Sequence, residues 1–161
     1  MPLHLTNNQL QQILTHAEQT YPEECCGLLL GTWDRSQPAS PKILLEVRPV
    51  QNAWSEAAAG WMASVGQDHP QIDAGKRDRY WIDPQEMLTA QRYARDHQLD
   101  IIGVYHSHPD HAAIPSECDR LLAWSAYLYV IVSVQQGTAQ DWRCWGLDEE
   151  QQFRSTEVIV L

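Results

Sequence analysis

Basic residues are scarce in this sequence, and their scarcity excludes one class of partner. The 161 residues include 11 lysines and arginines against 21 aspartates and glutamates, which gives a formal net charge of −10. Proteins that bind nucleic acids need a positive field toward the phosphate backbone. We therefore expect no nucleic-acid partner.

Long apolar runs are also absent. The longest mostly apolar stretch, residues 121–134, is too short to cross a bilayer as a helix, which takes about 20 residues. The N-terminal sequence MPLHLTNNQL lacks the basic segment and apolar core of a secretory signal. These features predict a cytoplasmic protein that does not associate with membranes.

Cysteine is present, but without the spacing of a metal or redox motif. The sequence contains Cys25, Cys26, Cys118 and Cys144. They form no CxxC pair and no zinc-ribbon pattern, so we expect reduced thiols. Cys25 and Cys26 open an apolar run, and we expect one of them to be buried and the other to face outward or toward a cleft. A nucleophilic cysteine partnered by a histidine is an alternative, although no nearby residue suggests a base.

The length and the apolar patterns predict a single α/β domain over residues 1–161. Apolar residues at three- and four-residue intervals predict helices over 5–20 and 83–97, the second capped by Asp83. Apolar runs between turn residues predict strands over 25–33, 43–50, 79–83, 101–106, 127–134, 141–147 and 153–161. The expected fold class is α/β, with a mixed, mostly antiparallel sheet flanked by helices.

Residues 54–78 fit neither a helix nor a strand. They show little periodicity, and they are longer than most loops that connect secondary-structure elements. They form either a functional flap or an insert on the surface, and the sequence leaves both interpretations open.

Two histidines follow the strand predicted over 101–106, and an aspartate stands further on. His106 and His108 are two residues apart on an extended backbone, so both imidazoles face one side and can converge on one ion. With Asp119 as a third ligand, the fourth tetrahedral position of zinc stays open for water. A polar strand end is the simpler interpretation of such a histidine pair. Ser116 and Asp119 also match a helix capping pattern, which Ser116 can combine with chemistry more easily than Asp119 can.

The segment from His106 to Asp119 resembles the signature of the JAMM or MPN-type metallopeptidases. That signature reads HxHP, six residues, then SxxD, with a glutamate far upstream, and the spacing here matches it in full. The upstream segment YPEECCGLLLG looks like the glutamate segment of the family, in which the catalytic glutamate stands three residues before the first glycine. This spacing selects Glu24 over Glu23.

The resemblance implies a small, single-domain zinc peptidase or isopeptidase with the cytidine-deaminase-like MPN fold. It implies that His106, His108 and Asp119 bind Zn²⁺. Glu24 is then expected to take a proton from the hydrolytic water, and Ser116 to stabilise the developing oxyanion. Short members of the family resemble enzymes that hydrolyse the amide bond after the C-terminal Gly-Gly of a small ubiquitin-like or sulfur-carrier protein, the expected partner here. The sequence leaves a homodimer open.

Other functions use a similar set of residues. A cupin-like non-haem iron oxygenase also binds its metal through two histidines and a carboxylate, but Gly103 stands too close to the histidines for the cupin pattern. A non-catalytic MPN scaffold typically lacks ligands, and none is missing here. A related DNA-repair family with an HNHPSG-type motif is contradicted by the sequence HSHPD and by the acidic charge. His111, on the loop after the motif, is expected to be solvated and not a ligand.

Overall fold

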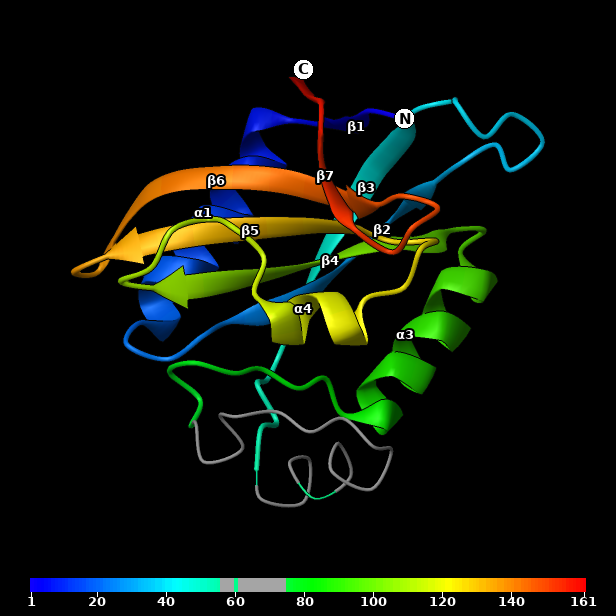
Figure 1. Cartoon of the computed structure of the whole chain (residues 1–161). Coiled ribbons are helices and arrows are strands. Elements are labelled where there is room, and N and C mark those ends of the chain that lie inside the picture. Colours follow the sequence, from blue (N-terminus) through cyan, green and yellow to red (C-terminus); the bar gives the residue numbers. More distant parts are fainter. Residues whose placement is uncertain (56–59, 61–74) are drawn as a thin grey trace.

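The computed structural model contains one eight-stranded sheet with helices packed against it (Figure 1). It describes residues 1–55, 60 and 75–161. The strands are β1 (Leu3–Leu5), β2 (Cys26–Thr32), β3 (Lys42–Val50), β4 (Asp100–Pro109), β5 (Leu128–Gln135), β6 (Thr138–Leu147), β7 (Phe153–Thr156) and β8 (Val158–Val160). The helices are α1 (Asn7–Thr20), α3 (Pro84–Asp96) and α4 (Glu117–Leu122). Most of the flap or insert predicted over 54–78 lies outside the described residues.

The sheet has the strand order β7-β6-β5-β4-β2-β3-β1-β8. The pairs β4–β5, β1–β3 and β1–β8 are parallel, and the other four are antiparallel. The mixed, mostly antiparallel sheet expected from the sequence is therefore confirmed. Only Glu157 separates β7 from β8, yet these strands pair at opposite ends of the order. The sheet is therefore curved, so that its two edge strands lie close enough to be joined within the continuous segment 153–160.

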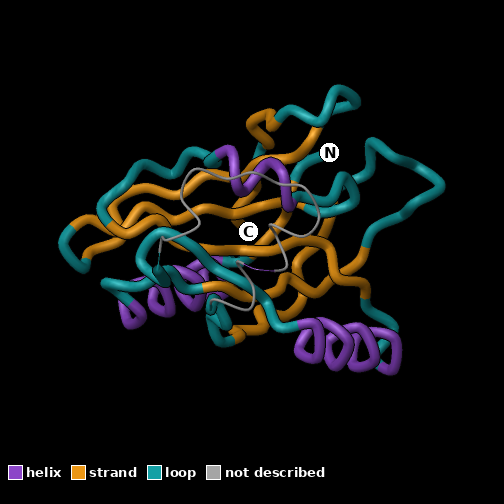
Figure 2. Tube along the Cα trace, turned by 60° about the horizontal axis from the view of Figure 1, so that its bottom comes forward, coloured by secondary structure: helices purple, strands orange, loops and turns teal. Residues whose placement is uncertain are grey.

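Each face of the sheet carries its own apolar core. Ala17 of α1 belongs to one core, and Ala90 of α3 belongs to the other. At the start of β2, Cys25 enters the first core and Cys26 enters the second, and both side chains are buried. Neither cysteine faces outward, because a strand covered on both faces has no solvent side. The other expected arrangement, a cysteine that faces a cleft, applies to Cys25, which lines a cavity of about 290 Å³. All four cysteines are free thiols. Figure 2 shows α1 and α4 on opposite sides of the strands.

Both long helices begin at a capping residue, and the cap of the second is Asp83, as the sequence predicts. Thr6 forms a capping box with Gln9 at the start of α1. The Asp83 side chain accepts a hydrogen bond from the backbone N–H of Gln85 (2.7 Å), and Pro84 occupies the first turn of α3. None of the described helices is long and apolar enough to cross a membrane.

Four strand predictions differ from the structure, and the simplest difference is that the strand predicted over 141–147 begins earlier, at Thr138, as β6. Residues 79–83 have no regular secondary structure, because the backbone of this segment bonds to residues after β3: the N–H of Ala53 donates to the carbonyl of Trp81 (2.8 Å). Strand β4 continues past its predicted end at His106, because it pairs with β5 as far as Pro109. The strand predicted over 153–161 divides at Glu157 into β7 and β8.

Gly103 allows β4 to approach β5 closely, and this approach generates a stability prediction. A Cβ atom at Gly103 would lie 2.3 Å from the backbone oxygen of Leu128. Gly103→Ala should therefore lower the free energy of unfolding by about 1–3 kcal/mol or more, the usual cost of overpacking, as measured by urea denaturation. The control is Gly75→Ala, since no described atom lies within 4 Å of the Cβ position there. Equal stability of the two variants would contradict the close packing of β4 on β5.

Candidate metal centre

Strand β4 ends in two histidines that face the same side of the sheet. His106 pairs with Cys26 of β2 and with Ile131 of β5, and His108 pairs with Ser133 of β5. The strand is thus held by neighbours on both sides where the first histidine stands. The two Nε2 atoms lie 3.2 Å apart, with His106 fully buried and the His108 side chain 12% exposed.

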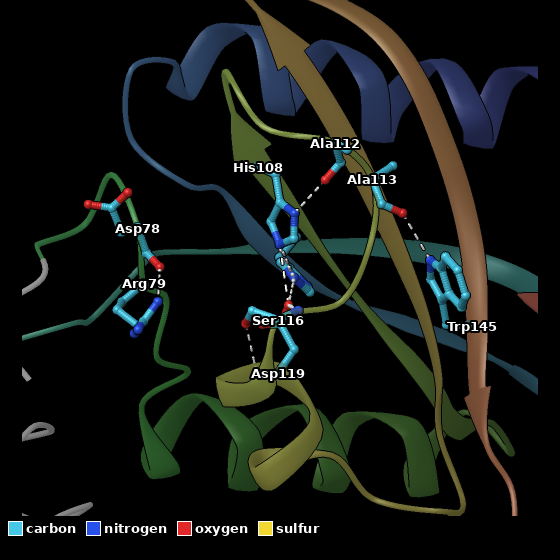
Figure 3. A network of polar contacts seen from close by, with 9 residues as sticks. Asp78, Arg79, His108, Ala112, Ala113, Ser116, Asp119 and Trp145 are labelled. Carbon is cyan, nitrogen blue, oxygen red and sulfur yellow. Dashed lines mark hydrogen bonds and ion pairs between the residues drawn. The ribbon is translucent and has the colours of Figure 1, made fainter. Parts of the chain in front are cut away.

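Helix α4 brings a carboxylate to the same place. Ser116 caps this helix: its Oγ accepts from the backbone N–H of Asp119 (3.1 Å), and its own N–H donates to Asp119 Oδ2 (2.8 Å). The same Oδ2 lies 3.3 Å from the Nε2 atom of His106 and 3.3 Å from that of His108 (Figure 3). The expected conflict between capping and a metal-facing role at Asp119 does not arise, because one oxygen satisfies both geometries.

The three atoms have the spacing that a tetrahedral metal ion requires. They form a triangle with sides of 3.2, 3.3 and 3.3 Å. Nitrogen and oxygen ligands about 2.0–2.1 Å from a tetrahedral zinc ion are separated from one another by about 3.3–3.4 Å. Two imidazoles and one carboxylate therefore fit the ion in number, chemistry and separation, and they leave one coordination position open.

A backbone carbonyl determines which nitrogen of the His108 ring carries the proton. Its Nδ1 lies 2.8 Å from the oxygen of Ala112, and because a carbonyl can only accept, Nδ1 carries the proton. In the neutral ring, the lone pair is then on Nε2, the atom that faces the cluster. The next carbonyl, that of Ala113, is held by the indole N–H of Trp145 (3.1 Å), which restrains the loop (Figure 3).

An aromatic ring covers the other histidine. Tyr80 stacks on His106, with ring centroids 4.4 Å apart and an interplanar angle of 24°. Burial lowers the pKa of His106, although the charge of Asp119 opposes this effect. The lowered pKa favours the neutral imidazole, which is the form that binds metals.

Glu24 adds a second carboxylate, from the segment just before β2. One oxygen of Glu24 and one ring nitrogen from each of His106 and His108 all lie within 4.8 Å of one another. The side chain of Glu24 is only 3% exposed, whereas that of its neighbour Glu23 is exposed. Of the two glutamates, Glu24 is therefore the one that faces the cluster.

The two carboxylates of the site differ in acidity. Burial raises the pKa of Glu24 well above its ordinary value, and the charge of Asp119 raises it further, whereas Arg79 acts in the opposite direction. Burial alone would also raise the pKa of Asp119, but when His106 and His108 are protonated, their charges and hydrogen bonds outweigh burial and hold that pKa well below the ordinary value. When the imidazoles are neutral, a bound divalent ion would supply the positive charge in their place. Asp119 therefore stays ionised beside the imidazoles, and Glu24 is suited to accept and release a proton.

A polar cavity of about 330 Å³ opens beside these residues. Glu24, Ser116 and Arg77 are among its lining residues. His111 also lines it, with the exposed side chain that its loop position predicts.

The alternative of a cysteine nucleophile finds no support in the structure. Burial raises the pKa of Cys25 and of Cys144 to about 12, and that of Cys118 to about 11. Burial also raises the pKa of Cys26. At neutral pH these thiols are protonated, and a protonated thiol is a poor nucleophile.

Two residues of the site were not predicted from the sequence. Tyr80 covers His106, and Arg79 lies close enough to Glu24 and His108 to affect the pKa of both. Both belong to the segment predicted as a short strand, and neither has a motif that marks it. The geometric signal exists only after folding, since Tyr80 and His106 are far apart in the chain.

Comparison with known proteins identifies the family. A sequence profile of Prok-JAB, described as prokaryotic homologs of the JAB domain, matches residues 6–145. The chain belongs to this family. The match spans both the Glu24 segment and the complete HxHP and SxxD motifs, so the JAMM or MPN-type family expected from the sequence is confirmed.

Individual relatives are similar over most of their length. A desampylase from Haloferax volcanii is 29% identical over 146 residues, which are 87% of this chain and 87% of that protein. The solution structure of a protein from Desulfitobacterium hafniense has a TM-score of 0.73 and 26% identity, covering 99% of this chain and 92% of that one. A JAB1/MPN domain protein from Archaeoglobus fulgidus has a TM-score of 0.51, 18% identity and 99% coverage of both chains, a likeness of fold alone.

The triangle of ligand atoms predicts about one zinc ion per chain, since three protein ligands and one open position match the preference of zinc. His108→Ala should lose most of the metal. His111→Ala, which alters an exposed histidine of the same cavity, should keep it. Metal analysis of protein purified without added metal measures both variants and also distinguishes zinc from iron. Full zinc occupancy in His108→Ala would contradict the predicted ligand set.

Proposed function

We propose that this protein is a zinc-dependent peptidase of the JAMM type. Its substrate is a small ubiquitin-like or sulfur-carrier protein, and the bond that it hydrolyses is the amide after the C-terminal Gly-Gly. The observation that carries the proposal is the triangle formed by His106, His108 and Asp119, with the buried carboxylate of Glu24 beside it. The name of the Haloferax volcanii relative, desampylase, supports the substrate class.

The residues divide the chemistry between them. His106, His108 and Asp119 would hold the zinc ion, which would supply a Lewis acid to polarise a carbonyl and acidify the attacking water. Glu24 takes the proton from that water and delivers it to the leaving amine, a cycle that its raised pKa favours. Asp119 keeps its negative charge throughout, because its pKa is low.

Ser116 has a position that allows a second role besides capping. Its Oγ accepts from the backbone N–H of Asp119, so the hydroxyl proton can point into the cavity that Ser116 lines. There it donates to the oxyanion that develops when water attacks the amide. Asp119 connects the helix cap with the proposed metal site, because it receives a hydrogen bond from the N–H of Ser116 and faces the histidines at the same time.

The state of the cysteines supports a cytoplasmic location. Four buried free thiols persist most easily in a reducing compartment. A cytoplasmic carrier protein would meet the enzyme there.

The direct test incubates the zinc-loaded chain with carrier fusions that continue beyond Gly-Gly, read by intact mass. We expect the carrier to shorten to its Gly-Gly end, and a fusion in which Ala-Ala replaces Gly-Gly to stay intact. Chain stripped of metal by a chelator should be inactive, and added zinc should restore cleavage. Cleavage that is unaffected by metal removal would contradict the proposed mechanism.

Neighbouring glutamates provide a matched pair for the proton-transfer step. Glu24→Gln keeps the size and polarity of the side chain but cannot accept a proton, so cleavage should fall by about 100-fold or more with zinc retained. Glu23→Gln alters an exposed residue and should leave the rate nearly unchanged. The opposite pattern would mean that the glutamate segment is misassigned by one residue.

Ser116→Ala tests the hydroxyl separately from the metal ligands. The loss of one oxyanion donor should lower turnover by roughly 100-fold or more with zinc still bound. Removal of the cap should also lower the melting temperature, because the helix cap is worth about 1 kcal/mol. If only the melting temperature changes, Ser116 is a cap and nothing more.

A further inference from the structure

Asn52, the second residue after β3, uses its whole side-chain amide to hold backbone groups. Its Nδ2 donates to the carbonyl oxygens of Glu24 (3.1 Å) and Arg79 (2.9 Å). Its Oδ1 accepts from the backbone N–H groups of Trp54 (3.0 Å) and Trp81 (3.2 Å). An asparagine side chain offers two donor hydrogens and one oxygen with two lone pairs, so these four bonds use its full capacity.

The four bonds join three separate segments around the site. Two backbone bonds run beside them: Ala53 N–H donates to the carbonyl of Trp81 (2.8 Å), and Glu24 N–H donates to the carbonyl of Lys76 (2.7 Å). Glu24 lies outside the strands, yet its N–H and its carbonyl are both held by these neighbouring segments. Its backbone is therefore placed by Asn52 on one side and by residue 76 on the other.

The same amide also brackets the aromatic ring that covers a histidine. Asn52 binds the carbonyl of Arg79 and the N–H of Trp81, the residues on either side of Tyr80. The ring of Tyr80 stacks on His106 at 4.4 Å. One side chain thus connects the backbone of the proposed base with the backbone that carries this ring.

We propose that Asn52 is a positioning residue, which sets the place of the Glu24 carboxylate relative to the His106–His108 pair. The proposal rests on the proposed function for its effect on turnover, and on the hydrogen bonds alone for its effect on structure. Among the residues that the structure describes, Asn52 reaches the reaction through Glu24 and Tyr80. Its loss should therefore reduce the rate of the proton-transfer step more than it reduces the binding of substrate or metal.

The test compares Asn52→Asp with the wild-type full chain, both loaded with zinc. Aspartate has nearly the same shape and keeps an acceptor for Trp54 and Trp81, but it cannot donate to the carbonyl oxygens of Glu24 and Arg79. The control is Gln51→Glu, which makes the same change of charge at the exposed neighbouring residue. If Asn52→Asp does not fold, Asn52→Ala is measured in its place under the same criteria.

We expect kcat of Asn52→Asp to fall by about 10- to 100-fold, the range expected when a catalytic group is displaced by up to about 1 Å. KM and zinc content should change little, and the amide hydrogen of Glu24 should exchange faster with deuterium. Gln51→Glu should match the wild type in all four readouts. An unchanged kcat, or a fall in kcat that accompanies loss of zinc, would overturn the positioning role.

A failure of the proposed function is distinguishable from a failure of this inference. If the wild-type chain cleaves no carrier fusion, the proposed function fails, and the positioning role is decided by hydrogen exchange alone. Faster exchange at Glu24 and residues 79–81 in the Asn52 variant, with none in Gln51→Glu, supports it. Unchanged exchange at those positions overturns it.

Discussion

The site depends on one constraint: the pairing of β4 with β2 and β5 holds two imidazoles with their Nε2 atoms 3.2 Å apart. Strand geometry places alternate residues on one face, and the parallel neighbour β5 extends the pairing to Pro109, so both histidine side chains leave the backbone on the same side. Gly103 permits the close approach of the two strands. Two neighbouring contacts restrain this pair. The Ala112 carbonyl keeps the proton of His108 on Nδ1, and the ring of Tyr80 stacks on His106.

The electrostatics follow from burying this pair with two carboxylates. Asp119 remains ionised because the imidazoles outweigh its desolvation, and its charge in turn raises the pKa of Glu24. A divalent ion at this place would satisfy the converging lone pairs of His106 and His108 and would offset the buried charge of Asp119. Glu24 completes the arrangement as the group with a variable proton.

The sequence predicts the strand and the capped helix that carry the candidate ligands, but not the segments that pack around them. The spacing of His106, His108, Ser116 and Asp119 contains the information for a strand followed by a capped helix, and both elements are present. Residues 79–83 contain an apolar run that is typical of a strand, but Asn52 and Ala53 bind the backbone of this segment instead. The two Asn52 bonds span 27 and 29 residues of the chain, so local sequence does not reveal them. Strand β1, of three residues, carries too little pattern to be recognised. The strand predicted over 153–161 contains β8, but nothing in the local sequence indicates that this part pairs with β1 and closes the sheet.

X-ray absorption spectroscopy of the zinc-loaded chain tests the central claim most directly, because it reports the ligand atoms themselves. If His106, His108 and Asp119 bind the ion, zinc has only nitrogen and oxygen neighbours at about 2.0–2.1 Å, with the scattering of two imidazole rings. The chain also offers four cysteine thiols, which would bind zinc through sulfur at about 2.3 Å. A sulfur neighbour, or a number of imidazoles other than two, would contradict the assignment of His106, His108 and Asp119 as the metal ligands.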